Sequence, residues 1–168
     1  KLRPLTDAMD EADVIILASP VYVYHVTGAM KTFLDHYGYR WMVHRPQGSM
    51  FRKQGVCIST AAGAGMKPTN KDMVDSLFFW GVAKRYQYGV RVAAVNWNGV
   101  SEKKKCAIDK ATSGIAKKIV NNSKHVKPGI KTRAMFWAMH FAQRKGFNPC
   151  DAEYWKSKGW TGKKRPWK

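Results

Sequence analysis

Three short apolar runs alternate with amphipathic stretches along the first 120 residues of the chain. The runs cover residues 13–19, 55–60 and 86–95. The first contains five consecutive apolar residues, three of them β-branched, which is typical of a strand buried on both faces of a parallel sheet. Pro20 ends this run because proline has no amide proton for a neighbouring strand. The pattern therefore predicts three strands.

Helical spacing of apolar residues predicts helices over 5–12, over 28–40, from a cap at Thr69 or Asn70 onward, and over 102–121. The hydroxyl of Thr27 can cap the second of these helices. Residues 42–53 form a polar connection that contains Pro and Gly. The side chains expected on the inner face of the last helix are those of Ile108, Ala111, Ile115 and Ile119.

The order strand then helix repeats three times, which indicates an α/β fold with a parallel sheet and right-handed crossovers. The pattern changes after residue 123. Residues 124–168 contain twelve Lys and Arg against two acids, for a net charge of +10, and end in a Trp-rich basic tail. We therefore predict an α/β domain over 1–123, followed by a basic, Trp-rich helical extension over 124–168.

The extension includes a helix predicted over 130–145, with an apolar centre and basic residues at both ends. Three interpretations remain open for it. It can be a core or subunit-interface helix, it can dock on a membrane surface through its basic and Trp residues, or it can be a surface helix without a partner.

The chain carries 30 Lys and Arg against 11 Asp and Glu, a net charge of +19. Such a charge attracts phosphates, nucleic acid or acidic lipid headgroups. No apolar run approaches the roughly 20 residues that span a bilayer. The three cysteines are far apart and the histidines lack metal-ligand spacing, so we predict no metal site, and a cytoplasmic location. The chain starts without Met or a signal peptide, and we expect it to begin part-way through a longer protein.

Two loops at the carboxyl ends of predicted strands are the candidate binding site, because ligands of open parallel sheets bind there. The first loop is stiff and aromatic, and the second is small enough for a ring to approach the backbone closely. Together they suit a flat heteroaromatic ligand. The residues concerned are Pro20, Val21, Tyr22 and Val23 in the first loop, and Thr60, Ala61, Ala62, Gly63, Ala64 and Gly65 in the second.

A family resemblance rests on these loops. The segment Ser19-Pro-Val-Tyr, followed by Val26-Thr-Gly-Ala-Met-Lys and Phe33-Leu-Asp, resembles the flavodoxin-like NAD(P)H-dependent FMN reductases. The segment Lys53-Gln-Gly-Val-Cys-Ile-Ser-Thr with its Ala/Gly loop resembles their next strand. The resemblance covers roughly residues 7–100. It implies a flavodoxin-like open parallel sheet with helices on both faces.

The resemblance also implies a function. FMN would lie between the two loops, hydride would pass from NAD(P)H to FMN, and the electrons would then reach a small-molecule or protein acceptor. Hydride transfer requires no general base, and we assign no catalytic residue. The family further implies a homodimer, and Asn96 to Gly99 could touch nicotinamide or substrate.

This sequence departs from the family at its start. The family's first strand and its phosphate-binding loop do not precede Lys1, so the strand at 13–19 corresponds to the third of five. We therefore expect an exposed apolar sheet edge. The cysteine cluster of some members is absent, and we predict no iron–sulfur cluster.

Two other functions remain open. One is a flavodoxin-type electron carrier, whose excess of positive charge would suit an acidic redox partner. The other is a basic module that binds nucleic acid, which is less favoured because we find no helix–turn–helix or ring-stacking motif.

Overall fold

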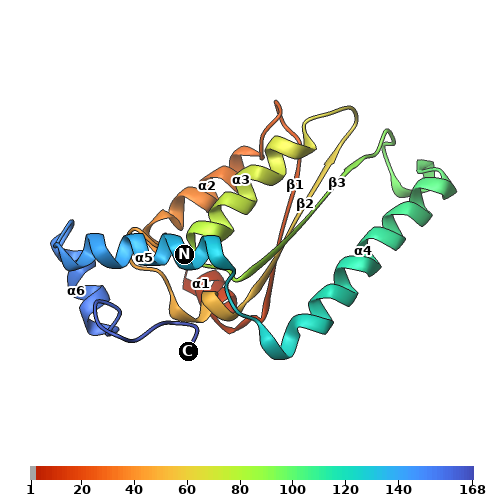
Figure 1. Ribbon diagram of the computed structural model, residues 1–168. Coiled ribbons are helices and arrows are strands. Elements are labelled where there is room, and N and C mark those ends of the chain that lie inside the picture. Colours follow the sequence, from red (N-terminus) through yellow and green to blue (C-terminus); the bar gives the residue numbers. More distant parts are fainter. Residues whose placement is uncertain (1–2) are drawn as a thin grey trace.

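The computed structural model describes residues 3–168, which form an open three-stranded sheet with helices around it (Figure 1). The strands are β1 (Val14–Pro20), β2 (Gln54–Ala61) and β3 (Lys84–Arg91). They lie in the order β1-β2-β3, and both pairs are parallel. The predicted α/β fold with an open parallel sheet is confirmed.

The α-helices are α1 (Arg3–Glu11), α2 (Gly28–His36), α3 (Met66–Phe79), α4 (Glu102–Asn122), α5 (Ile130–Arg144) and α6 (Pro149–Ser157). Short 3-10 turns cover Gly38–Arg40, Gly48–Arg52, Trp97–Gly99 and Ser123–His125. Helices α2 and α3 lie on one face of the sheet and α4 lies on the other, while α5 and α6 lie below α2 and α3 in this view (Figure 1). Helices therefore flank both faces, as predicted.

Several predicted boundaries differ from the structure. Helix α2 stops at His36, and a 3-10 turn takes up the rest of the predicted span. The Thr27 cap is confirmed, because its Oγ1 accepts from the amide of Met30 at 3.2 Å. The cap predicted at Thr69 or Asn70 is wrong: α3 starts directly after the small-residue loop, and both residues are buried within it. Strand β3 ends at Arg91 instead of residue 95.

Strand β1 is not buried on both faces, contrary to the prediction. Ile15 and Leu17 are buried against α2 and α3. Ile16 points to the other face and is 61% exposed, and Ala18 beside it is also exposed. Strand β1 does form an edge of the sheet, as expected, but the exposed side chains of Ile16 and Ala18 lie on its face.

This face of β1 stays open because of the position of α4. The structure describes every residue of α4, and none of them is buried. Its predicted inner face does turn toward the sheet but is only partly buried. Hydrogen bonds, and not a fully buried apolar face, hold the helix near the sheet. Gln54 Nε2 donates to the carbonyl of Ile119 at 2.9 Å, and Lys104 Nζ donates to the carbonyl of Arg91 at 2.7 Å.

The main core lies between the sheet and helices α2 and α3. It joins apolar side chains of α1, α2, α3, β1, β2 and the segments that connect them: Met9, Ile15, Leu17, Val26, Leu34, Tyr37, Met50, Cys57, Met73, Leu77, Trp80 and Val82. Burial of this apolar surface is the principal force that orders the two loops described below.

A second core joins the 42–53 connection to the C-terminal extension, and its buried members are Met42, Phe51, Phe136, Trp155 and Trp160. The connection is therefore not simply polar, because Met42, Met50 and Phe51 are fully buried. Trp155 Nε1 donates to the carbonyl of His44 at 2.7 Å. The extension is helical, as predicted, and contains α5 and α6. The division at residue 123 stays a prediction.

Candidate functional site

The two loops predicted to bind a ligand are neighbours. In the parallel register of β1 and β2, Pro20 pairs with Thr60. The amide of Val21 then donates to the carbonyl of Thr60 at 2.8 Å, one residue beyond the end of β1. Residues 20–23 and 60–65 therefore lie at the same edge of the sheet, as a single ligand requires.

The first loop closes in a tight turn. The amide of Tyr22 donates to the carbonyl of His25, and the amide of His25 donates back, both at 3.0 Å. The two central residues, Val23 and Tyr24, have φ angles of +49° and +65°. Positive φ is unfavourable for a β-branched residue such as valine. The turn is therefore strained, at a cost on the order of 1–3 kcal/mol for each such residue.

Contacts from α3 hold this turn in place. Asp72 accepts from His25 Nδ1 at 2.9 Å and from the amide of Val26 at 3.4 Å. The hydroxyl of Thr69 donates to the carbonyl of Tyr24 at 3.4 Å. The turn thus has a fixed shape in which the aromatic side chains of Tyr22 and Tyr24 stay exposed.

The second loop depends on one glycine for its approach to the first. Gly65 has φ +99°, and a Cβ atom there would lie 2.6 Å from Val21 Cγ1 and 3.2 Å from Tyr24 Cα. A side chain at this position would force the two loops apart. Gly63 differs, because a Cβ atom there would meet nothing within 4 Å. The space next to Gly63 is therefore open to a ligand.

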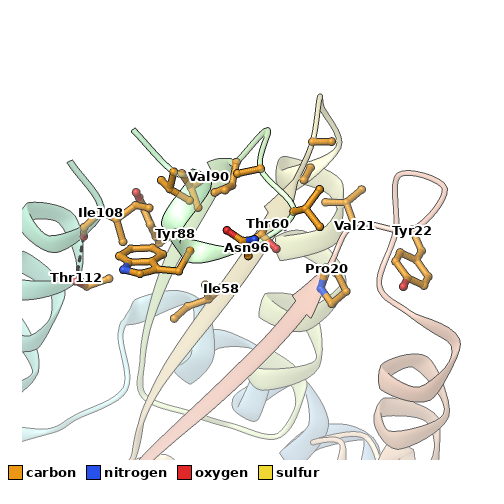
Figure 2. A pocket seen from close by; sticks show the side chains of 17 residues that line it. Pro20, Val21, Tyr22, Ile58, Thr60, Tyr88, Val90, Asn96, Ile108 and Thr112 are labelled. Carbon is orange, nitrogen blue, oxygen red and sulfur yellow. Dashed lines mark hydrogen bonds between the residues drawn. The ribbon is translucent and has the colours of Figure 1, made fainter. Parts of the chain in front are cut away.

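A cavity of about 580 Å³ opens between these loops, the sheet and α4. Its volume lies within the usual range for small-molecule sites. In Figure 2, Pro20 and Val21 lie on one side and Ile108 and Thr112 of α4 on the other, with Thr60 and Asn96 between them. The full lining is Pro20, Val21, Tyr22, Ile58, Thr60, Ala61, Ala62, Tyr88, Val90, Val92, Ala94, Val95, Asn96, Trp97, Val100, Ile108 and Thr112.

The chemistry of this lining is mainly apolar and aromatic. Among the described residues that form it, there is no carboxylate, imidazole, thiol or amine. Thr60, Asn96 and Thr112 supply polar side chains, Tyr22 and Tyr88 add phenol hydroxyls, and the side chains of 60–62 are small. Such a surface can position a flat ring, and its described residues include no carboxylate or imidazole for general acid–base catalysis.

Six of the ten predicted binding residues line the cavity, namely Pro20, Val21, Tyr22, Thr60, Ala61 and Ala62. The other four do not. Val23 is 92% exposed at the tip of the turn, Gly65 packs against the first loop, and Gly63 and Ala64 lie exposed beside the cavity.

Sequence reasoning missed the wall formed by β3 and α4. Tyr88, Val90 and Val92 recur at every second position, which places them on one face of a strand. This alternation could have shown the wall. Asn96 and Trp97, which belong to the turn that could touch nicotinamide or substrate, do line the cavity.

The cysteines lie away from this cavity. Cys57 is in the main core, where burial raises the pKa of its thiol to about 12. Cys106 and Cys150 are exposed and unpaired. Nowhere within residues 3–168 do three or more His, Cys, Asp or Glu side chains gather as a metal site would require.

Comparison with known proteins decides the family. A model of the NADPH-dependent FMN reductases matches residues 1–94, more than half of the chain. The chain belongs to the NADPH-dependent FMN reductase family. Both candidate loops lie within the part that matches, whereas the wall formed by α4 lies entirely beyond it.

Two known proteins are similar to parts of this FMN reductase family member. The iron–sulfur flavoprotein of Archaeoglobus fulgidus is 45% identical over 60 residues, which are 34% of this chain and 24% of that protein. The structure of a flavone reductase superposes with a TM-score of 0.57 at 17% identity, over 76% of this chain and 49% of that one. The second likeness supports the flavodoxin-like fold alone. The chain spans about a quarter and about half of the lengths of these two proteins.

Proposed function

We propose that this chain forms the flavin-ring site of an oxidoreductase that takes hydride from NAD(P)H and passes electrons to a small-molecule or protein acceptor. The observation that supports it most is the direct contact of the two loops, Val21 with Thr60, beside an apolar cavity of about 580 Å³. Family membership supports FMN as the cofactor, because the matching family is that of the NADPH-dependent FMN reductases.

The residues present fit an isoalloxazine ring. The ring would lie against Ala61 and Ala62, where small side chains let it approach the backbone, with Pro20 and Val21 at its other side. The backbone of Ala62 could bind its polar edge, as could the hydroxyl of Thr60, whereas the carbonyls of Thr60 and Ala61 already accept from the amides of Val21 and Val92. When bound, FMN supplies the redox chemistry, while the protein orients it and limits the access of water.

The basic residues around the cavity suit a phosphate-bearing hydride donor. A second cavity of about 320 Å³ adjoins the first, shares Ala62 and Val92 with it, and is lined by Arg91 and Lys104. Clefts lined by charge of one sign concentrate ligands of the opposite sign. NAD(P)H carries several phosphate charges, so these two cations would favour its approach.

The experiment combines spectroscopy with two sets of variants. The purified chain is mixed with FMN, and quenching of flavin fluorescence gives the dissociation constant; NADPH is then added without oxygen. We expect a bound flavin spectrum that bleaches on addition of NADPH. Arg91→Gln with Lys104→Gln should raise the KM for NADPH about tenfold. Arg91→Gln alone keeps the bond from Lys104 Nζ to the backbone carbonyl at position 91, which holds α4 near the sheet, and should raise the KM with little change in FMN affinity. The control, Lys117→Gln with Lys118→Gln on exposed positions of α4, should leave both constants unchanged.

The outcomes separate the candidate functions. A chain that does not bind FMN would overturn the proposal as a whole. Binding of FMN without reduction by NADPH would instead support the electron carrier. An unchanged KM in the Arg91 and Lys104 variants would reject only their proposed role.

A further inference from the structure

Helix α5 presents an apolar stripe to solvent. Its inner face is anchored by Phe136 and His140, which are buried. On the other side, Ile130, Trp137 and Phe141 are 86%, 42% and 56% exposed. With the exposed Ala134, they occupy positions spaced by four, three and four residues, which align along one face of a helix. The 15-residue helix is about 22 Å long, and the stripe runs along most of it.

Basic residues border this stripe on both sides. At 100° per residue, Arg133 and Arg144 fall on one flank, and Lys131 and Lys145 fall on the other. All four are exposed. Arg165 from the C-terminal tail adds a fifth cation, whose guanidinium carbon lies 4.1 Å from the centre of the Trp137 ring. Phe147, just beyond the helix, extends the apolar surface.

The extension has few acids to balance these cations. Within residues 124–168, all of which the structure describes, the acids are Asp151 and Glu153. Asp151 is buried and accepts from His44 Nδ1 at 2.9 Å, so Glu153 is the one exposed acid. A second copy docked on the same face would bring together two extensions that each carry a net charge of +10. The occupant must therefore be strongly negative and must also accept aromatic and aliphatic side chains.

We propose that the outer face of α5 docks on an anionic lipid surface. An interfacial helix has this composition, with Trp, Phe and aliphatic residues on the side that enters the headgroup boundary and Lys and Arg beside them. Each basic residue near such a surface adds attraction. None of the helices within residues 3–168 is long and apolar enough to cross a membrane. The helix would thus lie along the bilayer surface, held to the rest of the protein by its buried face.

Neither α5 nor the tail contributes a residue to the flavin cavity, so this proposal does not rest on the proposed function. The test uses the full chain and sedimentation with vesicles in about 0.1 M salt. One set of vesicles is neutral phosphatidylcholine, and the other contains about 30 mol% phosphatidylglycerol. We expect partitioning to rise at least about tenfold with the anionic lipid.

Two pairs of variants locate the contact. Ile130→Ser with Phe141→Ser removes part of the stripe, and its control, Leu5→Ser with Val120→Ser, changes exposed apolar residues elsewhere. Lys131→Glu with Lys145→Glu reverses two flanking charges, and Lys117→Glu with Lys118→Glu makes the same charge change on α4. Both α5 variants should lower partitioning at least about tenfold, and the controls less than about threefold. Circular dichroism verifies that each variant is folded.

Three results would overturn the proposal. The first is equal binding to neutral and anionic vesicles. The second is an equal loss in the control variants, because general charge would then suffice. The third is evidence that another occupant covers the stripe. This would be a dimer in light scattering that Ile130→Ser with Phe141→Ser dissociates, or tighter binding to an oligonucleotide than to vesicles.

Discussion

Replacing Gly65 by alanine tests the contact between the two loops most directly. The new Cβ atom would lie 2.6 Å from Val21 Cγ1 and 3.2 Å from Tyr24 Cα, at a residue with φ +99°. The left-handed conformation costs an L-residue roughly 1–2 kcal/mol, and a clash in a packed region costs roughly 1–3 kcal/mol. We therefore expect Gly65→Ala to lower the free energy of unfolding by about 2–5 kcal/mol.

The matched control lies two residues away. Gly63 has open space around its would-be Cβ atom and a φ outside the left-handed region, so Gly63→Ala should change stability by less than about 1 kcal/mol. Urea denaturation gives both values, and thermal unfolding should show a fall of roughly 2–4 °C for each kcal/mol lost. If Gly65→Ala is as stable as the unmodified protein, or Gly63→Ala loses as much, the loops do not meet as described.

Three further predictions concern the cavity, the second core and the thiols. Ala62→Phe places a ring inside the cavity and should weaken FMN binding at least about tenfold, measured by flavin fluorescence, with no loss of stability in urea. Trp155→Ala removes a fully buried indole and should lower the free energy of unfolding by about 3–5 kcal/mol, so a loss below about 1 kcal/mol would argue against the second core. Because burial raises the pKa of the Cys57 thiol to about 12, iodoacetamide at pH 8 should alkylate Cys106 and Cys150 but spare Cys57, as mass spectrometry of the folded protein would show.

The sequence allowed the parallel sheet and the meeting of the two loops to be predicted, because apolar runs separated by helices imply parallel strands. The carboxyl ends of such strands share one edge, so the segments after Pro20 and Thr60 had to be close. The strained turn could not be predicted. Val23 disfavours positive φ, and the conformation depends on contacts from Asp72 and Thr69 that are remote in sequence.

The second core and the position of α4 were also beyond sequence reasoning. Met42 and Phe51 belong to two short apolar groups, 41–43 and 50–51, separated by a stretch that contains Pro and Gly, so no helical or strand periodicity marks them as buried. Ile108 and its helical neighbours were correctly expected to face the sheet. Their spacing indicates which side of the helix faces the sheet but not how far the helix lies from it. The helix lies far enough away to leave the cavity between α4 and the sheet.

The second core has a consequence for synthesis on the ribosome. Phe51 is made more than a hundred positions before Trp160, whose indole ring packs against it. Until the C-terminal helices emerge, the nascent chain carries Met42 and Phe51 without their partners, a state prone to aggregate or to recruit chaperones. A premature stop codon anywhere between residues 124 and 155 would make that state permanent. Quality control should then remove the product even though every strand of the sheet is present.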